Sequence, residues 1–208
     1  IRGDSMYKGI AGSEGIGIGK AVLIQEHEIH IETKTVTAPE EEIKRLQNAI
    51  EKFVVRTTEM AAKMDETVGE KDADILRGHI QMLQDPMIEE QISALMVSEK
   101  ITAEMAVEQV LEQTAEMFAQ IPDELLQQRA TDFRDIKTRM LKILMGIEDV
   151  DISQVPAGTV LVARDLTPSM TAGINPDNIA GILTEVGGRT SHSAILARAM
   201  EIPAVLSI

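Results

Sequence analysis

One long helical pattern occupies the middle of the chain, from Pro39 to about Met145, and limits the possible folds more than any other feature. In its first part, apolar residues recur every three or four positions, which is typical of one face of an amphipathic helix. That stripe comprises Ile43, Leu46, Ile50, Phe53, Thr57, Met60 and Met64. Gly69 ends this first helix, so more helices must follow within the segment.

The rest of the segment predicts three further helical arms. A helix over 71–84 is broken by Asp85 and Pro86, after which a shorter helix follows. Thr102 is a candidate N-cap for the next helix, and Pro122-Asp123-Glu124 opens the last one, which Gly146 stops. Four long arms with short connections predict an up-and-down bundle in which one arm is broken.

The two ends of the chain have a different character, rich in glycine and β-branched residues. Residues 6–31 predict short strands, and further strands are predicted at 158–163, 179–184 and 204–208, with a helix over 191–200. The simplest arrangement is one α/β domain built from 6–36 and 147–208, with the helical bundle of 37–146 inserted. We expect this domain to be incomplete at its C-terminus. Residues 1–5 are interpreted as a cloning remnant.

Composition excludes several classes of function. The net charge of -14 disfavours nucleic acid and anionic membranes as partners and suits a basic protein partner or simply solubility. Cysteine is absent, which removes disulfides, thiol catalysis and thiolate metal sites. No apolar run approaches the roughly 20 residues that span a bilayer. We expect a cytoplasmic protein.

The segment from Val186 to Ala194 contains the best candidate for chemistry, because it joins a predicted strand to a helix. Gly187 and Gly188 allow close approach to a ligand, and the first helical turn offers backbone N–H groups to an anion. Arg189 adds a cation and Thr190, Ser191 and Ser193 add hydroxyls. His192 lies among them and should be neutral near pH 7 at a helix N-terminus. We interpret His192 as a nucleophile that carries a phosphoryl group; the alternative is an ordinary surface histidine on a capped helix.

Three other sites are weaker. Gly17-Ile18-Gly19-Lys20 lacks the spacing of a phosphate loop and the Ser or Thr that should follow the lysine. Ser191 and Ser193 lack the glycine-flanked elbow of a serine hydrolase. His27 and His30 have metal-ligand spacing but no third ligand nearby.

Residues 187–198, followed by Glu201-Ile202-Pro203-Ala204-Val205, closely resemble the active-site histidine motif of the enzyme I family, the phosphoenolpyruvate–protein phosphotransferases of the bacterial sugar phosphotransferase system. The likeness runs from Met6 over nearly the whole chain. It includes Gly9–Gly12, Gly15-Ile16, Gly19–Ala21, Gly78–Ile80, Leu83, Asp85, Arg129-Ala130, Asp132, Arg134–Ile136 and Asp165–Ser169.

The resemblance implies a mechanism. The family's histidine at the position of His192 takes a phosphoryl group from phosphoenolpyruvate on Nε2 and passes it to a histidine of the small carrier HPr. Thr171 is expected to bond the other ring nitrogen and set the tautomer. Arg189, with Thr190 and Ser191, is expected to contact the phosphoryl group.

The resemblance also implies that the helical insert binds HPr. The docking residues carried over are Glu70, His79, Met82, Asp85, Met87, Ile88, Glu89 and Arg129. The acidic members would meet arginines of HPr. The break at Pro86 favours exposure of Met82, Met87 and Ile88, whereas bundle core is the alternative for each, and His79 could be a satisfied buried histidine.

In the family, phosphoenolpyruvate and Mg²⁺ bind a separate C-terminal barrel that also forms the homodimer. We therefore expect this chain to be monomeric, to hold no metal and to need phospho-HPr rather than phosphoenolpyruvate as donor. Two alternatives remain. One is the phosphohistidine domain of a phosphoenolpyruvate synthase or pyruvate phosphate dikinase, and the other is a non-catalytic docking module.

Overall fold

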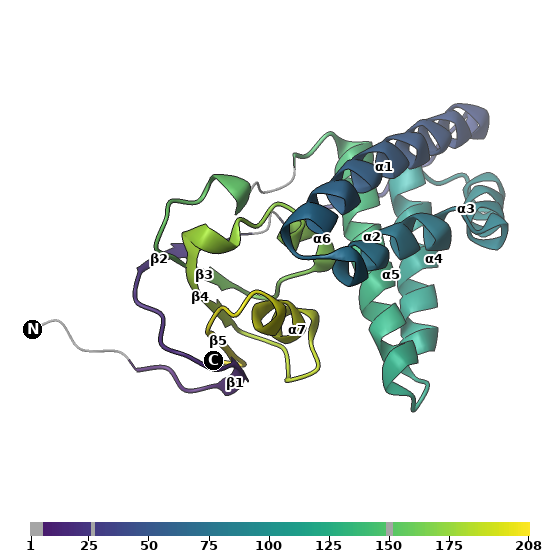
Figure 1. Cartoon of the computed structure of the whole chain (residues 1–208). Coiled ribbons are helices and arrows are strands. Elements are labelled where there is room, and N and C mark those ends of the chain that lie inside the picture. The colour runs from purple at the N-terminus through teal and green to yellow at the C-terminus, as the bar shows by residue number, and fades with distance from the viewer. Residues whose placement is uncertain (1–5, 26–27, 149–151) are drawn as a thin grey trace, which may run out of the picture. The chain divides into compact units, whose positions relative to one another are not determined.

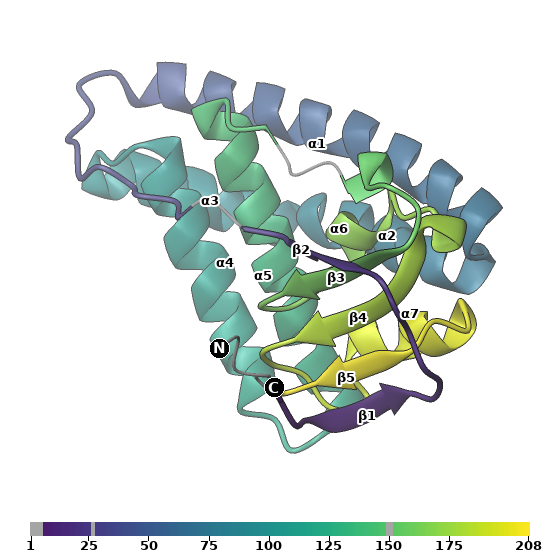
Figure 2. The same cartoon turned by 90° about the vertical axis from the view of Figure 1, so that its left-hand side faces the viewer.

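Both ends of the chain contribute strands to one mixed sheet in the computed structural model, which describes residues 6–25, 28–148 and 152–208. The strands are β1 (Ile10–Ser13), β2 (Lys20–Leu23), β3 (Thr159–Ala163), β4 (Ile179–Thr184) and β5 (Ala204–Leu206). They lie in the order β1-β5-β4-β3-β2, with β2 to β5 parallel and β1 antiparallel at the edge (Figure 2). The predicted fold class, with a sheet domain built from both ends, is confirmed.

The glycines between β1 and β2 have a structural role. A Cβ on Gly17 would lie 1.9 Å from the backbone oxygen of Ala180, and one on Gly19 would lie 2.1 Å from that of Gly158. Both contacts are at the starts of parallel strands β3 and β4. These glycines therefore let the chain cross the amino end of the sheet closely.

Helix α7 (His192–Ala199) packs against the sheet beside β1 and β5 (Figure 1). Its buried face joins residues of β3, β4 and β5 in a core that includes Leu161, Ile182, Ala194, Leu196 and Leu206. The short helix α6 (Pro168–Thr171) follows β3, with Thr167 as its N-cap. Two 3-10 turns, Ile152–Gln154 and Pro176–Asn178, complete the connections.

The helical segment contains α1 (Pro39–Thr67), α2 (Glu70–Leu83), α3 (Pro86–Glu99), α4 (Ala103–Ala119) and α5 (Glu124–Met145). The side chain of Asp85 accepts a hydrogen bond from Met87 N and so starts α3 immediately after α2. This confirms the bundle with one broken arm. Leu46, Phe53, Ile92, Leu111 and Ile136 are among its buried core residues.

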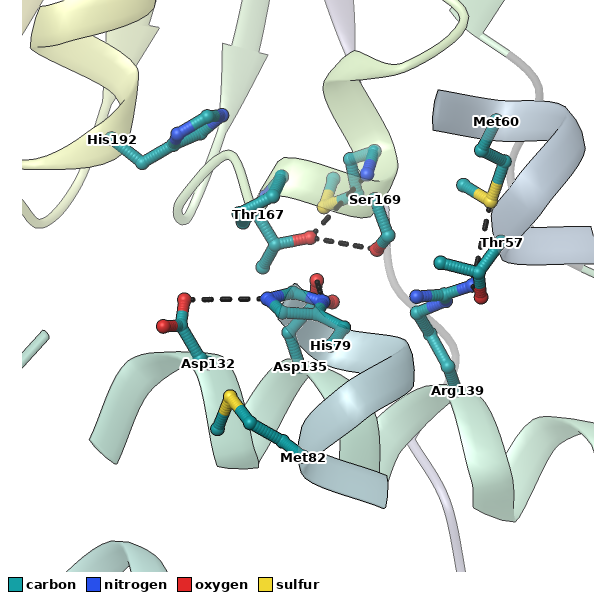
Figure 3. Close-up of polar contacts among 12 residues, drawn as sticks. Thr57, Met60, His79, Met82, Asp132, Asp135, Arg139, Thr167, Ser169 and His192 are labelled. Carbon is teal, nitrogen blue, oxygen red and sulfur yellow. Dashed lines mark hydrogen bonds and ion pairs between the residues drawn. The ribbon is translucent and has the colours of Figure 1, made fainter. Parts of the chain in front are cut away.

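One position of the predicted apolar stripe carries a polar contact. The hydroxyl of Thr57 is buried, donates to Phe53 O at 2.6 Å and lies against the guanidinium of Arg139 (Figure 3). Arg139 is itself buried and stacks over the Phe53 ring at 4.2 Å. The bundle core therefore buries a hydrogen-bonded cation among its apolar side chains.

The described residues form two compact units. The first comprises 6–25, 62–73 and 152–208, and the second comprises 28–61 and 74–148. The end of α1 and the start of α2 thus belong to the unit that holds the sheet, and Val68 packs against that unit's core. No described helix is long and apolar enough to cross a membrane.

Candidate phosphohistidine site

The loop that carries the predicted site leaves the carboxyl end of β4 and enters α7. Glu185 N and Val186 N donate to Ala163 O and Arg164 O, which extends the pairing of β4 with β3 past the end of the strands. Gly187 then has a φ of 112°, a conformation that favours glycine. The loop therefore turns sharply at the position where the sequence predicted close approach to a ligand.

Ser191 caps α7, and its side chain accepts from Ala194 N at 3.4 Å. His192 is consequently the first residue of the helix and is half-buried. Arg189 and Thr190 precede it with exposed side chains. The structure thus brings the loop residues of the predicted site together around the N-terminus of an eight-residue helix.

Thr171 lies at hydrogen-bond distance from the His192 ring, although the two residues are 21 positions apart. The contact joins Thr171 Oγ1 and His192 Nε2 at 3.0 Å, and Thr171 is fully buried. The pairing of these residues agrees with the expectation from the family. The bonded ring nitrogen differs from that expectation, because the resemblance implied that Thr171 bonds the nitrogen other than Nε2. Rotation of the imidazole about its bond to Cβ decides which nitrogen faces Thr171, and here that nitrogen is Nε2.

The Thr171 hydroxyl has one proton for several partners. Pro168 O lies at 3.0 Å and Thr167 O at 3.2 Å, and both are backbone acceptors one helical turn back. When the proton points to Pro168 O, the Thr171 oxygen accepts from Nε2–H of His192. Nε2 then carries a proton, and it cannot attack phosphorus until that proton is lost.

The contact between Ser193 and Asp165 was not predicted: the Ser193 hydroxyl was expected to face the anion, and Asp165 was not named as a site residue. Ser193 is fully buried, and its hydroxyl donates to Asp165 Oδ1 at 3.0 Å. Burial raises the pKa of Asp165, against the opposing effects of hydrogen bonds from Ser193 and Leu166 N and of the Arg164 charge. Asp165 lies in the family-like segment Asp165–Ser169, but no local pattern indicates a partner 28 residues away.

In the second unit, the predicted docking residues His79 and Arg129 both contact Asp132, and Met82 contacts Arg129. Figure 3 shows His79, Met82 and Asp132. His79 Nε2 lies 3.3 Å from Asp132 Oδ1, and Arg129 Nη1 lies 3.7 Å from Asp132 Oδ2 and 3.5 Å from Met82 Sδ. The His79 side chain is 1 % exposed, and its Nδ1 lies 3.7 Å from Asp135 Oδ2. The alternative of a buried bundle histidine therefore describes the position of His79.

The remaining docking residues differ in exposure. Met87 is 66 % exposed, Asp85 is exposed and Glu89 is partly exposed. Ile88 is only 8 % exposed, so the expectation that the break at Pro86 exposes it is wrong. Ile88 instead packs into the bundle with Ile92 and Met96. Glu70 is exposed at the start of α2 and belongs to the first unit.

Within the described ranges, no group of three or more His, Cys, Asp or Glu side chains could hold a metal ion. His27, one of the two histidines with metal-ligand spacing, and residues 1–5, the suggested cloning remnant, lie outside the described residues.

Comparisons with known proteins cover most of the chain and agree with one another. The family model for the N-terminal domain of PEP-utilising enzymes matches residues 8–129, and the model for the mobile domain of PEP-utilising enzymes matches residues 155–208. Curated relatives named phosphoenolpyruvate-protein phosphotransferase include one from Mycoplasma capricolum, 37% identical over 201 residues, and one from Haemophilus influenzae, 36% identical over 203 residues. Each alignment covers 97% of this chain and 35% of the relative, so the chain spans about a third of their length.

Two solved structures share the fold. The NMR structure titled as enzyme I (nEIt) has a TM-score of 0.83 and 38% identity, and the alignment covers 97% of this chain and 82% of that one. The structure titled "N-terminal domain of Enzyme 1 - Nitrogen" has a TM-score of 0.64 and 25% identity, with 96% and 82% covered.

Proposed function

The chain belongs to the family of PEP-utilising enzymes, as the N-terminal region of an enzyme I, and on that premise we propose that His192 carries a phosphoryl group between phosphoenolpyruvate and HPr. The observation that carries the proposal is the position of His192. It is the first residue of a helix, on a glycine loop at the carboxyl end of a parallel sheet, with its ring held by Thr171.

The chemistry follows from the charges that change during transfer. In the exchange with phospho-HPr, a lone pair on a His192 ring nitrogen attacks phosphorus, a new N–P bond forms, and the N–P bond of the HPr histidine breaks. The N–H groups and positive dipole end of α7 favour the anion that arrives at the ring. The side chains of Arg189 and Thr190 are exposed, and we expect the guanidinium and the hydroxyl to contact phosphate oxygens. Because exchange with phospho-HPr consumes one phosphohistidine and forms another, the same site can serve transfer in either direction.

HPr is the proposed partner of the helical unit. Asp85, Met87 and Glu89 lie at the start of α3 with accessible side chains, and Arg129 is exposed on α5. An apolar methionine among carboxylates suits a basic partner with an apolar contact patch. Met82, Glu70 and His79 stay in the proposed set because of the family resemblance. Because His79 is buried, we propose that it contributes to HPr binding indirectly, through its contact with Asp132.

Phosphoenolpyruvate, Mg²⁺ and the homodimer contacts are proposed to belong to the part of enzyme I that this chain does not span. The chain by itself is proposed to be monomeric and cytoplasmic, and to exchange phosphoryl groups with phospho-HPr.

Two alternatives are less well supported. A phosphohistidine domain of a phosphoenolpyruvate synthase or dikinase would use the same histidine chemistry, but the relatives are named phosphoenolpyruvate-protein phosphotransferase and the fold is that of enzyme I. A docking module without catalysis could dispense with the loop from Gly187 to Ser193, which is intact here.

The test is phosphoryl uptake from phospho-HPr, followed as acid-labile phosphate by intact-protein mass spectrometry. We expect wild type and His30→Ala, which removes an exposed histidine elsewhere, to be labelled equally. We expect His192→Ala to take no label, a loss of at least about 10³-fold because the nucleophile is gone. Label on His192→Ala, or label on the wild type that requires ATP, would contradict the proposal.

A further inference from the structure

Two hydrogen bonds join the same pair of segments beside His192. The segment after β3 provides Asp165 and Thr171, and the start of α7 provides Ser193 and His192. Ser193 Oγ to Asp165 Oδ1 measures 3.0 Å, and Thr171 Oγ1 to His192 Nε2 also measures 3.0 Å. The hydrogen bond between the imidazole and Thr171 and the one between Ser193 and Asp165 therefore join the same two segments.

The second bond is built into the interior. Ser193 is 0% exposed, and Asp165 Oδ1 also accepts from Leu166 N at 2.8 Å, so the carboxylate is fixed against its own backbone. A hydrogen bond to a carboxylate is shorter and stronger than one between neutral groups. The Ser193 hydroxyl has a poorer alternative acceptor in Leu166 O at 3.4 Å.

Burial alone makes this carboxylate costly, and it raises the pKa of Asp165 against the hydrogen bonds and the Arg164 charge that oppose it. An apolar residue would fill such a position without that cost. Neither side chain is available as a donor to a phosphoryl group, because the buried Ser193 hydroxyl donates to Asp165 and the Asp165 oxygen is an acceptor.

We propose that Asp165 and Ser193 are positioning residues for phosphoryl transfer, because their hydrogen bond fixes the first turn of α7 against the segment of Thr171 and so holds the His192 ring in place. The inference rests on the proposed function of His192. The bond restricts rotation and translation of the first turn of α7. His192 lies in that turn, so a small displacement there would move the reacting nitrogen. A misplacement of about 1 Å at a reacting group can cost about 100-fold in rate.

The experiment compares four variants with wild type. Ser193→Ala and Asp165→Ala remove the bond from either side, and Asp165→Asn keeps an acceptor oxygen. The fourth, Ser193→Ala/Asp165→Ala, removes the bond without leaving a buried charge unpaired. Thr159→Val is the matched control, because Thr159 is 2% exposed and its hydroxyl donates to Pro156 O at 2.7 Å at the opposite end of β3.

Three quantities are measured for each protein: thermal unfolding, the ¹⁵N resonances of the His192 ring, and the rate of labelling by phospho-HPr as a function of its concentration. We expect the ring resonances to change in both single alanine variants and in the double variant. We expect the maximal rate to fall about 10- to 100-fold with the half-saturating concentration unchanged. Asp165→Asn should stay within about threefold of wild type, and Thr159→Val should lose stability only.

The double variant separates positioning from stability. We expect it to recover stability relative to Ser193→Ala while its ring resonances and rate stay altered. The proposal is overturned if the double variant regains the wild-type rate, if all variants behave as Thr159→Val does, or if Asp165→Asn is as slow as Asp165→Ala. If wild type takes no label at all, the proposed function fails, whereas the resonances of unphosphorylated His192 still decide whether the bond positions the ring.

Discussion

At the residue scale, local sequence indicates His192 as the proposed nucleophile, but it does not indicate the orientation of the His192 ring. Two glycines, an arginine, three hydroxyl residues and a helix start surround His192 within nine residues. The ring orientation depends on Thr171, which is brought in by α6 from another part of the chain. Rotation about one side-chain bond exchanges Nε2 and Nδ1, and no local pattern specifies it. Local sequence therefore indicates His192 as the candidate residue, but it does not specify which ring nitrogen is bonded to Thr171.

Substitution of Thr171 tests this orientation. Thr171→Val keeps the shape of the side chain but removes the hydroxyl that contacts Nε2, Pro168 O and Thr167 O. We expect the Nε2 resonance of His192 to shift toward that of a solvated imidazole and the protein to lose about 1 kcal/mol of stability, the typical value of one hydrogen bond. Ring ¹⁵N spectra and chemical unfolding measure the two effects. An unchanged Nε2 resonance would mean that Thr171 does not bond this nitrogen.

At the scale of elements, the period of apolar residues predicted most of the fold correctly. The four arms, the break at Pro86, strands β3 to β5 and helix α7 all follow from spacing and capping residues. Ile88 is an exception, because it was expected to be exposed and is buried. Asp85 caps α3, and Ile88, Ile92 and Met96 recur every four residues along it, which is a buried stripe. The break therefore starts a new amphipathic helix and leaves Met87, one position earlier, outside the stripe.

The loop between β4 and α7 offers a matched pair of glycine substitutions. At Gly187, alanine would meet both a φ of 112° and the Ser191 hydroxyl at 3.1 Å from its Cβ, so the helix cap must shift. A Cβ on Gly188 meets nothing within 4 Å. We expect Gly187→Ala to cost about 1–3 kcal/mol of stability and to slow labelling of His192, while Gly188→Ala costs less than about 1 kcal/mol. Thermal unfolding and the labelling assay check this pair; equal effects would show that the loop does not depend on the Gly187 conformation.

At the scale of the whole molecule, the limits of the two units depend on packing that the sequence pattern does not reveal. Periodicity places residues 62–73 in the helical insert, because they are helical. In the structure these residues group with the sheet unit, where Val68 meets the core. A helix can therefore begin in one unit and end in the other. Hydrophobic spacing indicates which face of a helix is buried, but it does not indicate which other residues cover that face.

The net charge of -14 is also a property of the whole molecule, and it predicts how a basic partner approaches. Glu89→Lys and Glu70→Lys reverse partly or fully exposed carboxylates of the proposed docking set, and Glu51→Lys makes the same change of charge on an exposed position of α1. If the docking carboxylates steer HPr, association should slow about 3- to 10-fold for the first two variants at about 10 mM salt and much less near 150 mM, where the screening length is only about 8 Å. Glu51→Lys should show the smaller effect of net charge alone. Stopped-flow association rates at both salt concentrations measure this, and equal slowing in all three variants would mean that the overall field, and not the docking residues, sets the rate.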